Sequence, residues 1–201
     1  PALSCFEEPL DLNLVFSGHG KHLDCPTLRL TNHHGLMIAG EAALSNWDAG
    51  MDMYIYGKLG NLTMTKEGIN VLMTNLTGKV PPILQRLDYI RFNGEAAGYL
   101  HDLTLTGLFH TGAGMVKTDV MMSIDEQSMS RTYSGSVASA DLDLGKLLNQ
   151  EKKFGKVDFN VELKGFNYKN RYPESYIKGI ISSFEYSQYQ YENIMLDGVY
   201  K

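Results

Sequence analysis

Apolar and polar residues alternate along most of the chain. In the clearest run, Val157, Phe159, Val161 and Leu163 take every second position, and charged or polar residues fill the positions between them. Similar runs recur from residue 10 to residue 124. Such alternation places one face of a strand on an apolar interior and the other in water. It indicates an antiparallel sheet, because parallel strands of α/β proteins are continuously apolar.

Glycine-containing turn signals separate the predicted strands, at residues 17–20, 32–35, 66–68 and 111–114. Two stretches favour short helices. Residues 81–87 begin with a proline pair, and residues 143–148 follow Asp143, a residue suited to an N-cap. Residues 69–73 are predicted as a strand because Ile69, Val71 and Met73 alternate. We therefore expect an all-β fold with one or two short helical turns, and helix in less than a tenth of the chain.

A short internal repeat supports an elongated β array. The tetrapeptide Gly-Glu-Ala-Ala at residues 40–43 recurs at residues 94–97. A fixed spacing between similar segments is typical of a structural module used more than once. We expect residues 1–201 to form one β-rich segment, with a possible division into two modules near residues 78–88.

Composition narrows the classes of function. The chain has 201 residues, of which 23 are acidic and 18 basic, for a formal net charge of −5. A nucleic-acid-binding protein usually carries a basic excess, so no nucleic-acid partner is expected. No apolar run approaches the ~20 residues of a membrane helix, so this segment is expected to have no membrane span. Cys5 and Cys25 could form a disulfide in an oxidising compartment or remain thiols in a reducing one.

Sequence motifs of catalysis are missing. The chain contains no P-loop, no dinucleotide fingerprint and no G-x-S-x-G motif. His19, His22 and Cys25 are close in sequence, but their spacing is not that of a standard zinc site. We therefore predict no catalytic residue, no metal and no cofactor, and a protein that is not an enzyme.

Four successive blocks in the second half of the chain resemble the AsmA-like/TamB family, in its Bacteroidetes branch. The resemblance is dense from about residue 80 onward and looser before it. The blocks are residues 89–109 (YIRFNG, then GY, HDL and GLF), 133–148 (YSGS, then DLDLGKLL), 155–165 (GKVDFNV, then G) and 177–198 (IKGIISSFEY, then YENI and LDG).

This resemblance implies a large periplasmic protein, held in the inner membrane of a Gram-negative bacterium by an N-terminal helix, of which this chain would be a segment. It implies a β-taco, a curled open sheet with an apolar groove. It also implies phospholipid transport between the inner and outer membranes, outer-membrane protein assembly with a barrel partner of the Omp85 type, or both. The family has no catalytic motif.

The apolar positions of the predicted strands are the candidate lipid-groove residues. Several are methionines, which adapt to varied apolar partners. The candidates are Leu12, Leu14, Leu28, Leu30, Ile38, Met51, Met53, Ile55, Leu62, Met64, Val71, Met73, Ile90, Phe92, Leu103, Leu105, Val116, Val120, Met122, Val157, Phe159, Val161 and Leu163. Alternation alone favours a different arrangement, a closed β-sandwich acting as a structural, adhesin or interaction module. A carbohydrate-binding or hydrolytic β-protein is a further alternative, raised by the twelve tyrosines.

Overall fold

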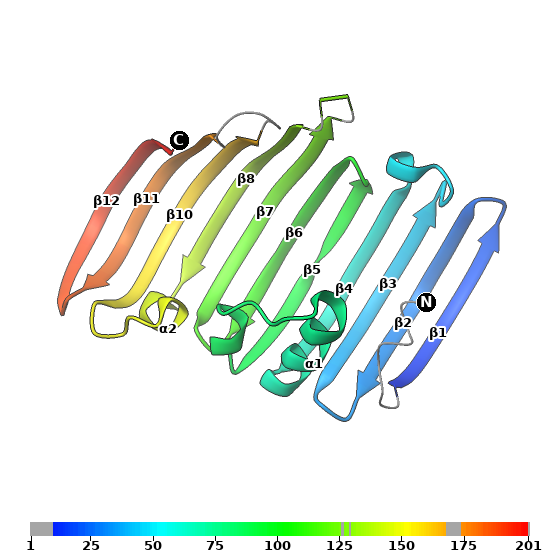
Figure 1. Cartoon of the computed structure of the whole chain (residues 1–201), viewed down its shortest axis with the longest axis horizontal. Helices are drawn as coiled ribbons and strands as arrows, with labels where there is room; N and C mark the ends of the chain where they lie inside the picture. The colour runs from blue at the N-terminus through cyan, green and yellow to red at the C-terminus, as the bar shows by residue number, and fades with distance from the viewer. Residues whose placement is uncertain (1–9, 126, 129, 168–173, 201) are drawn as a thin grey trace.

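The computed structural model describes residues 10–125, 127–128, 130–167 and 174–200, and its strands form one antiparallel sheet (Figure 1). Strands make up most of the described residues, and α-helix and 3-10 helix together account for 11% of the chain. The all-β, antiparallel prediction is confirmed. The strands are β1 (Leu10–His19), β2 (His22–Asn32), β3 (Leu36–Ser45), β4 (Tyr54–Thr65), β5 (Tyr89–Tyr99), β6 (Asp102–Thr111), β7 (Gly114–Asp125), β8 (Ser130–Ala140), β9 (Leu142–Asp143), β10 (Phe154–Asn167), β11 (Glu174–Tyr186) and β12 (Tyr189–Tyr200).

The sheet is a meander in which spatial order follows chain order. Each long strand pairs with the one before it, and the two-residue β9 pairs with the start of β10. The chain leaves the sheet after β4 through two helical segments and returns as β5, which pairs directly with β4. The described strands therefore make one layer, and no second sheet among them closes a sandwich.

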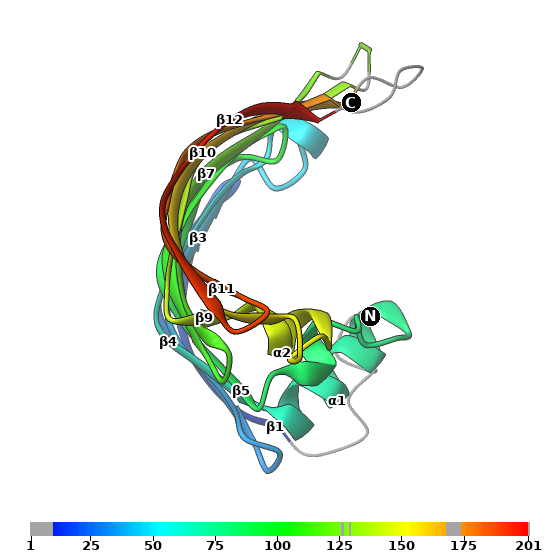
Figure 2. The same ribbon diagram turned by 90° about the vertical axis from the view of Figure 1, so that its left-hand side faces the viewer.

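The sheet curls along the strand direction, so that it has a concave and a convex side (Figure 2). We call the concave side the inward face and the convex side the outward face. Four register shifts lie near mid-strand in the N-terminal half, between Val15 and Ser17, Cys25 and Leu28, Ala39 and Gly40, and Leu59 and Leu62. In each shift the extra residue belongs to β2 or to β4, so the bulges bend these two strands near their middles.

In the C-terminal half, two glycines with positive φ values lie where neighbouring strands approach closely. Gly135 of β8 and Gly179 of β11 have φ values of +145° and +156°, which L side chains rarely adopt. A Cβ on Gly135 would lie 2.1 Å from the Asp119 carbonyl oxygen, and one on Gly179 would lie 2.2 Å from that of Asn160. Only glycine allows neighbouring strands to approach this closely at these two points.

Helices cover one margin of the inward face, which we call the lower margin from its place in Figure 1. They are α1 (Lys66–Thr77), the 3-10 segment η2 (Leu84–Arg86) and α2 (Leu144–Leu148). Their apolar side chains pack with strand residues into the main buried cluster. This cluster joins Ile69, Leu87, Ile90 and Ala113 to Met64, Met73, Val80, Leu84, Phe109 and Leu147.

One predicted strand is wrong, because residues 69–73 lie in α1. The helix is capped at its start by the Thr65 hydroxyl, which accepts from Gly68 N at 3.2 Å, and at its end by left-handed Gly78. Val71 and Met73 therefore do not lie on the sheet. Because of α1, the helix content also exceeds the predicted limit of a tenth.

Met51 and Met53 are also misplaced by the strand prediction. Met51 belongs to the 3-10 segment η1 (Gly50–Asp52), and Met53 precedes the first residue of β4. The two predicted short helices are confirmed as η2 and α2. The Asp143 side chain caps α2 by accepting from Lys146 N at 2.8 Å.

Candidate functional site

The inward face presents rows of mostly apolar side chains across the strands. Register fixes these rows, because paired residues on neighbouring antiparallel strands point to the same side. One complete row from β1 to β7 is Leu12, Leu30, Ile38, Leu62, Phe92, Phe109 and Val116. The helices pack on this same side, since Met64 and Ile90 belong to their cluster.

Most of the candidate groove residues lie at inward positions of the sheet. The four exceptions are those placed elsewhere by the structure: Met51, Met53, Val71 and Met73. Those on the inward face are Leu12, Leu14, Leu28, Leu30, Ile38, Ile55, Leu62, Met64, Ile90, Phe92, Leu103, Leu105, Val116, Val120, Met122, Val157, Phe159, Val161 and Leu163.

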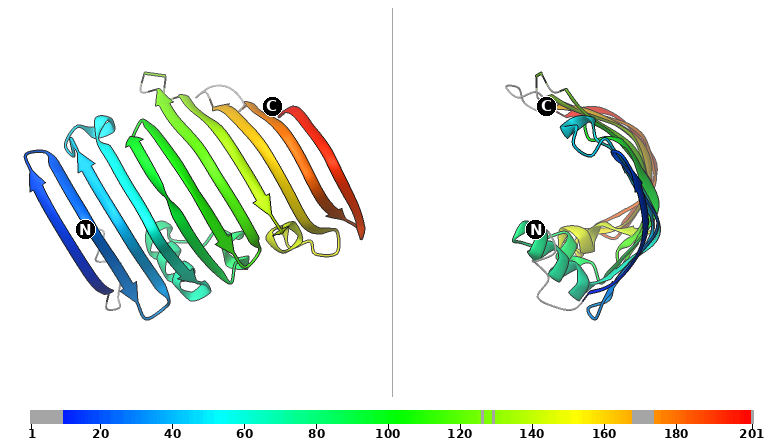
Figure 3. Two further views of the ribbon diagram at one scale, coloured as in Figure 1. Left: turned by 180° about the vertical axis from the view of Figure 1, so that it is seen from behind. Right: turned by 90° about the vertical axis from the view of Figure 1, so that its right-hand side faces the viewer.

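The inward face is open in some places and filled in others. Leu14 and Met122 are 41% and 56% exposed, whereas Phe92 and Val161 are 8% and 5% exposed. Met64 and Ile90 pack under α1 and η2, so protein already fills the space above them. The helices cover only part of the inward face and leave the rest of it open (Figure 3).

Small residues form part of the floor of the inward face. Ala42, Gly57 and Ala96 are neighbours at one level of β3 to β5, and this level continues through Leu105 and Val120 to Gly135. Nearby, the Phe92 ring lies over two glycines: a Cβ on Gly94 or Gly107 would meet it at 2.6 or 2.3 Å. An apolar chain crossing β3 to β5 at the level of Ala42 and Ala96 would contact the sheet closely.

The sequence prediction missed the apolar residues of the last two strands. Phe184 pairs with Val157 and with Tyr191, so an aromatic group continues the inward face at the lower end of β10–β12. Ring centroids lie 5.5 Å apart for Phe154 and Tyr186 and 6.5 Å apart for Phe184 and Tyr191. The register shift beside Asp158 breaks the alternation of β11, which hides these positions from a period-two search.

Charge is almost excluded from the inward face. Among the described strands, register and alternation place a single charged residue there, Arg131 near the start of β8. It shares its level with Ile124 and Asn167. The other charged residues of these strands occupy outward positions or the ends of strands. The two faces of the sheet therefore differ in chemistry as well as in curvature.

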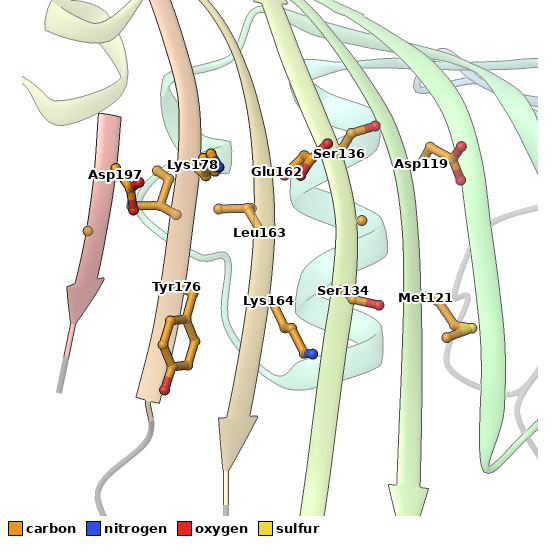
Figure 4. A pocket seen from close by; sticks show the side chains of 13 residues that line it. Asp119, Met121, Ser134, Ser136, Glu162, Leu163, Lys164, Tyr176, Lys178 and Asp197 are labelled. Carbon is orange, nitrogen blue, oxygen red and sulfur yellow. The ribbon is translucent and has the colours of Figure 1, made fainter. Parts of the chain in front are cut away.

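The outward face carries a ladder of charged and polar residues at one level, across nine strands. The ladder runs Glu41, Lys58, Glu95, Thr106, Asp119, Ser136, Glu162, Lys178 and Asp197. Tyr56 donates to Glu41 at 3.0 Å, and this bond raises the pKa of Tyr56. Part of the ladder borders a shallow depression of about 640 Å³, where Lys178, Glu162, Ser136 and Asp119 follow one another on neighbouring strands (Figure 4).

This depression suits solvent and ions better than acyl chains. Carboxylates alternate with Lys178 and Ser136, and opposite charges on neighbouring strands attract. Asp119 and Glu162 are separated by one intervening strand, which puts their backbones about 10 Å apart. In the part of the chain that the structure describes, no three His, Cys, Asp or Glu residues are grouped to hold a metal.

The predicted disulfide is untested, because Cys5 lies outside the described residues. Cys25 carries a free thiol at an inward position, and its Sγ donates to the Thr27 carbonyl at 3.3 Å.

No protein-family model, no curated protein and no solved structure matches the chain. The resemblance to the AsmA-like/TamB family therefore stays a prediction. Within the described residues, neither α1 nor any other helix has the length and apolar content to cross a bilayer.

Proposed function

We propose that the inward face is a trough that holds the acyl chains of phospholipids. The single observation that carries this proposal is the separation of chemistry between the faces: one charged residue at the inward positions of the described strands, and a nine-strand polar ladder on the outward face. Burying one methylene group is worth about 0.8 kcal/mol, so an apolar surface can hold an acyl chain without specific polar contacts.

The role in the cell is taken from the resemblance. The chain would act in the periplasm as part of a longer bridge anchored in the inner membrane. Phospholipid would move along the trough between the inner and outer membranes, with their head groups at its open margin. Assembly of outer-membrane proteins with an Omp85-type barrel is the second task that the resemblance implies. The open single layer favours these roles over an adhesin with a closed core.

Photo-crosslinking can compare the two faces at matched positions. Met122 and Met121 are neighbours on β7 with similar exposure, 56% and 45%, on opposite faces. Leu14 and Val15 form a second pair on β1, 41% and 54% exposed. A diazirine amino acid is placed at each position, and the purified chain is irradiated with vesicles of phosphatidylethanolamine and phosphatidylglycerol.

We expect phospholipid adducts, detected by mass spectrometry, at Met122 and Leu14 and not at Met121 and Val15. Equal capture within each pair, or no capture at either face, would contradict the trough.

A further inference from the structure

We propose that Arg131 forms a binding site for the anionic head group of the amphiphile whose tail occupies the inward face. This inference rests on the proposed trough and adds the chemistry and the position of the polar end. The site lies at the margin opposite the helices, beside Tyr133 and Ser175 on the neighbouring level of the sheet.

Arg131 is the inward cation that is free to take a ligand. Its side chain is exposed, and within the described residues no hydrogen bond or ion pair engages its guanidinium. Cations at the lower margin are already used: Arg86 donates to the Leu147 carbonyl, and Lys146 donates to Asp88 at 2.6 Å and to the Gly112 carbonyl at 3.0 Å. A planar guanidinium can bind a phosphate or carboxylate through two parallel hydrogen bonds.

The level next to Arg131 has the character of a membrane interface. The Tyr133 ring covers Gly165, since a Cβ there would lie 2.0 Å from a ring atom. Its hydroxyl lies 2.6 Å from the Ser175 hydroxyl, and Tyr200 follows on the same level with 74% exposure. Rings that are apolar on their faces and polar at their tips favour the boundary between hydrocarbon and water.

The remaining inward surface is long enough for a tail. From Gly165 to Val157 along β10 the inward face extends about 26 Å at the usual rise per residue. Leu163 and Phe159 on this path are partly exposed, whereas Val161 and Val157 are buried. One leaflet of a bilayer holds its chains within about 15 Å. An amphiphile with its anion on Arg131 would therefore direct its tail toward the helices, over Leu163 and Phe159.

The test uses three amphiphiles with the same C16 tail, below their micelle concentrations: lysophosphatidic acid, palmitate and uncharged monopalmitoylglycerol. Dissociation constants are measured for the unchanged chain and for Arg131→Gln, Arg131→Lys and Arg29→Gln. Arg29 is a matched control, because it is an exposed arginine at an outward position of β2. Thermal unfolding verifies that each variant is folded.

We expect Arg131→Gln to weaken binding of the anions about fivefold and to leave monopalmitoylglycerol unchanged. Arg131→Lys should give an intermediate affinity, and Arg29→Gln should change nothing. A loss confined to lysophosphatidic acid identifies a phosphate head group, and one confined to palmitate identifies a fatty-acid carboxylate.

Unchanged anion binding in Arg131→Gln, equal weakening of all three amphiphiles, or equal weakening by Arg29→Gln would overturn the head-group site while the trough stands. Failure of all three amphiphiles to bind the unchanged chain would overturn the trough itself, and the head-group site with it.

Discussion

At the scale of single residues, glycines at one level of the sheet differ in whether a larger side chain would fit. Gly57 and Gly135 share one inward level, but their surroundings differ. A Cβ on Gly57 would meet nothing within 4 Å, whereas one on Gly135 would strike the backbone of β7. Gly135 also has a backbone conformation that alanine adopts only with strain.

We expect Gly135→Ala to lower the free energy of unfolding by about 3 kcal/mol, from backbone strain and overpacking together. Gly57→Ala should stay within about 0.5 kcal/mol of the unchanged chain, since it adds one methyl group to open space. Urea titration followed by circular dichroism measures both variants. Equal losses for the two substitutions would contradict the steric difference between the two sites.

The sequence predicts the facing of side chains well where alternation is regular. Val157 and Val161 are buried and Asn160 and Glu162 are exposed, as the period-two pattern indicates. It cannot predict which glycine is tightly packed, because Gly57 and Gly135 look alike in a pattern of alternating small residues. That difference arises from the distance to a strand that is separate in sequence.

At the scale of elements, most predicted strands are present and α1 is the main error. Ile69, Val71 and Met73 alternate, but Ile69, Leu72, Met73 and Leu76 also have the spacing of a helical stripe. Over so short a run, the apolar positions fit both the period of a strand and the period of a helix. Thr65 and Gly78 carry the deciding signal, because a hydroxyl N-cap and a glycine C-cap thirteen residues apart enclose a helix of ordinary length.

The candidate groove could be predicted for β1 to β10 and not for β11 and β12. The inward positions of the earlier strands follow from alternation within each strand. In β11 the alternation is interrupted near Ser182. The face on which each later residue lies then depends on the pairing of β11 with β10. Arg131 is likewise an ordinary surface arginine in the sequence, and only the register places it on the apolar face.

The helical cover of the lower margin is tied to the sheet by an ion pair between distant elements. Asp88, which precedes β5, accepts from Lys146 of α2 at 2.6 Å. This hydrogen bond, together with the charge of the same ammonium group, holds the pKa of Asp88 below its usual range. A carboxyl group whose pKa is lower in the folded state stabilises the fold above its unfolded pKa, about 3.9.

The contribution of this pair should be lost as the pH falls from about 4 through the depressed pKa of Asp88. We expect the free energy of unfolding to decline less steeply with acid in Asp88→Asn than in the unchanged chain. Lys146→Met should flatten the curve similarly, and the double variant should add no further change in slope. Denaturant titrations between about pH 3 and pH 6 test this. Parallel curves for all variants would show that the pair does not connect α2 to the sheet energetically.

At the scale of the whole molecule, the described chain is a single layer with two open edges. β1 and β12 each pair with one strand only. β12 is twelve residues long, and two apolar residues on it, Met195 and Val199, are 83% and 53% exposed. An edge strand offers unpaired backbone donors and acceptors to another chain, and long apolar edges associate most readily.

We therefore expect the purified chain to associate with itself through these edges as its concentration rises. The substitution pair Met195→Lys and Val199→Lys should shift the association to higher concentration, because a second strand would bring like charges together at the new junction. Met121→Lys is the matched control: it adds a charge at an exposed outward methionine of β7, a strand paired on both sides. Sedimentation velocity over a concentration series distinguishes the variants. A chain that stays monomeric throughout would exclude edge pairing, and equal dissociation by Met121→Lys would place the association on a face of the sheet instead of its edge.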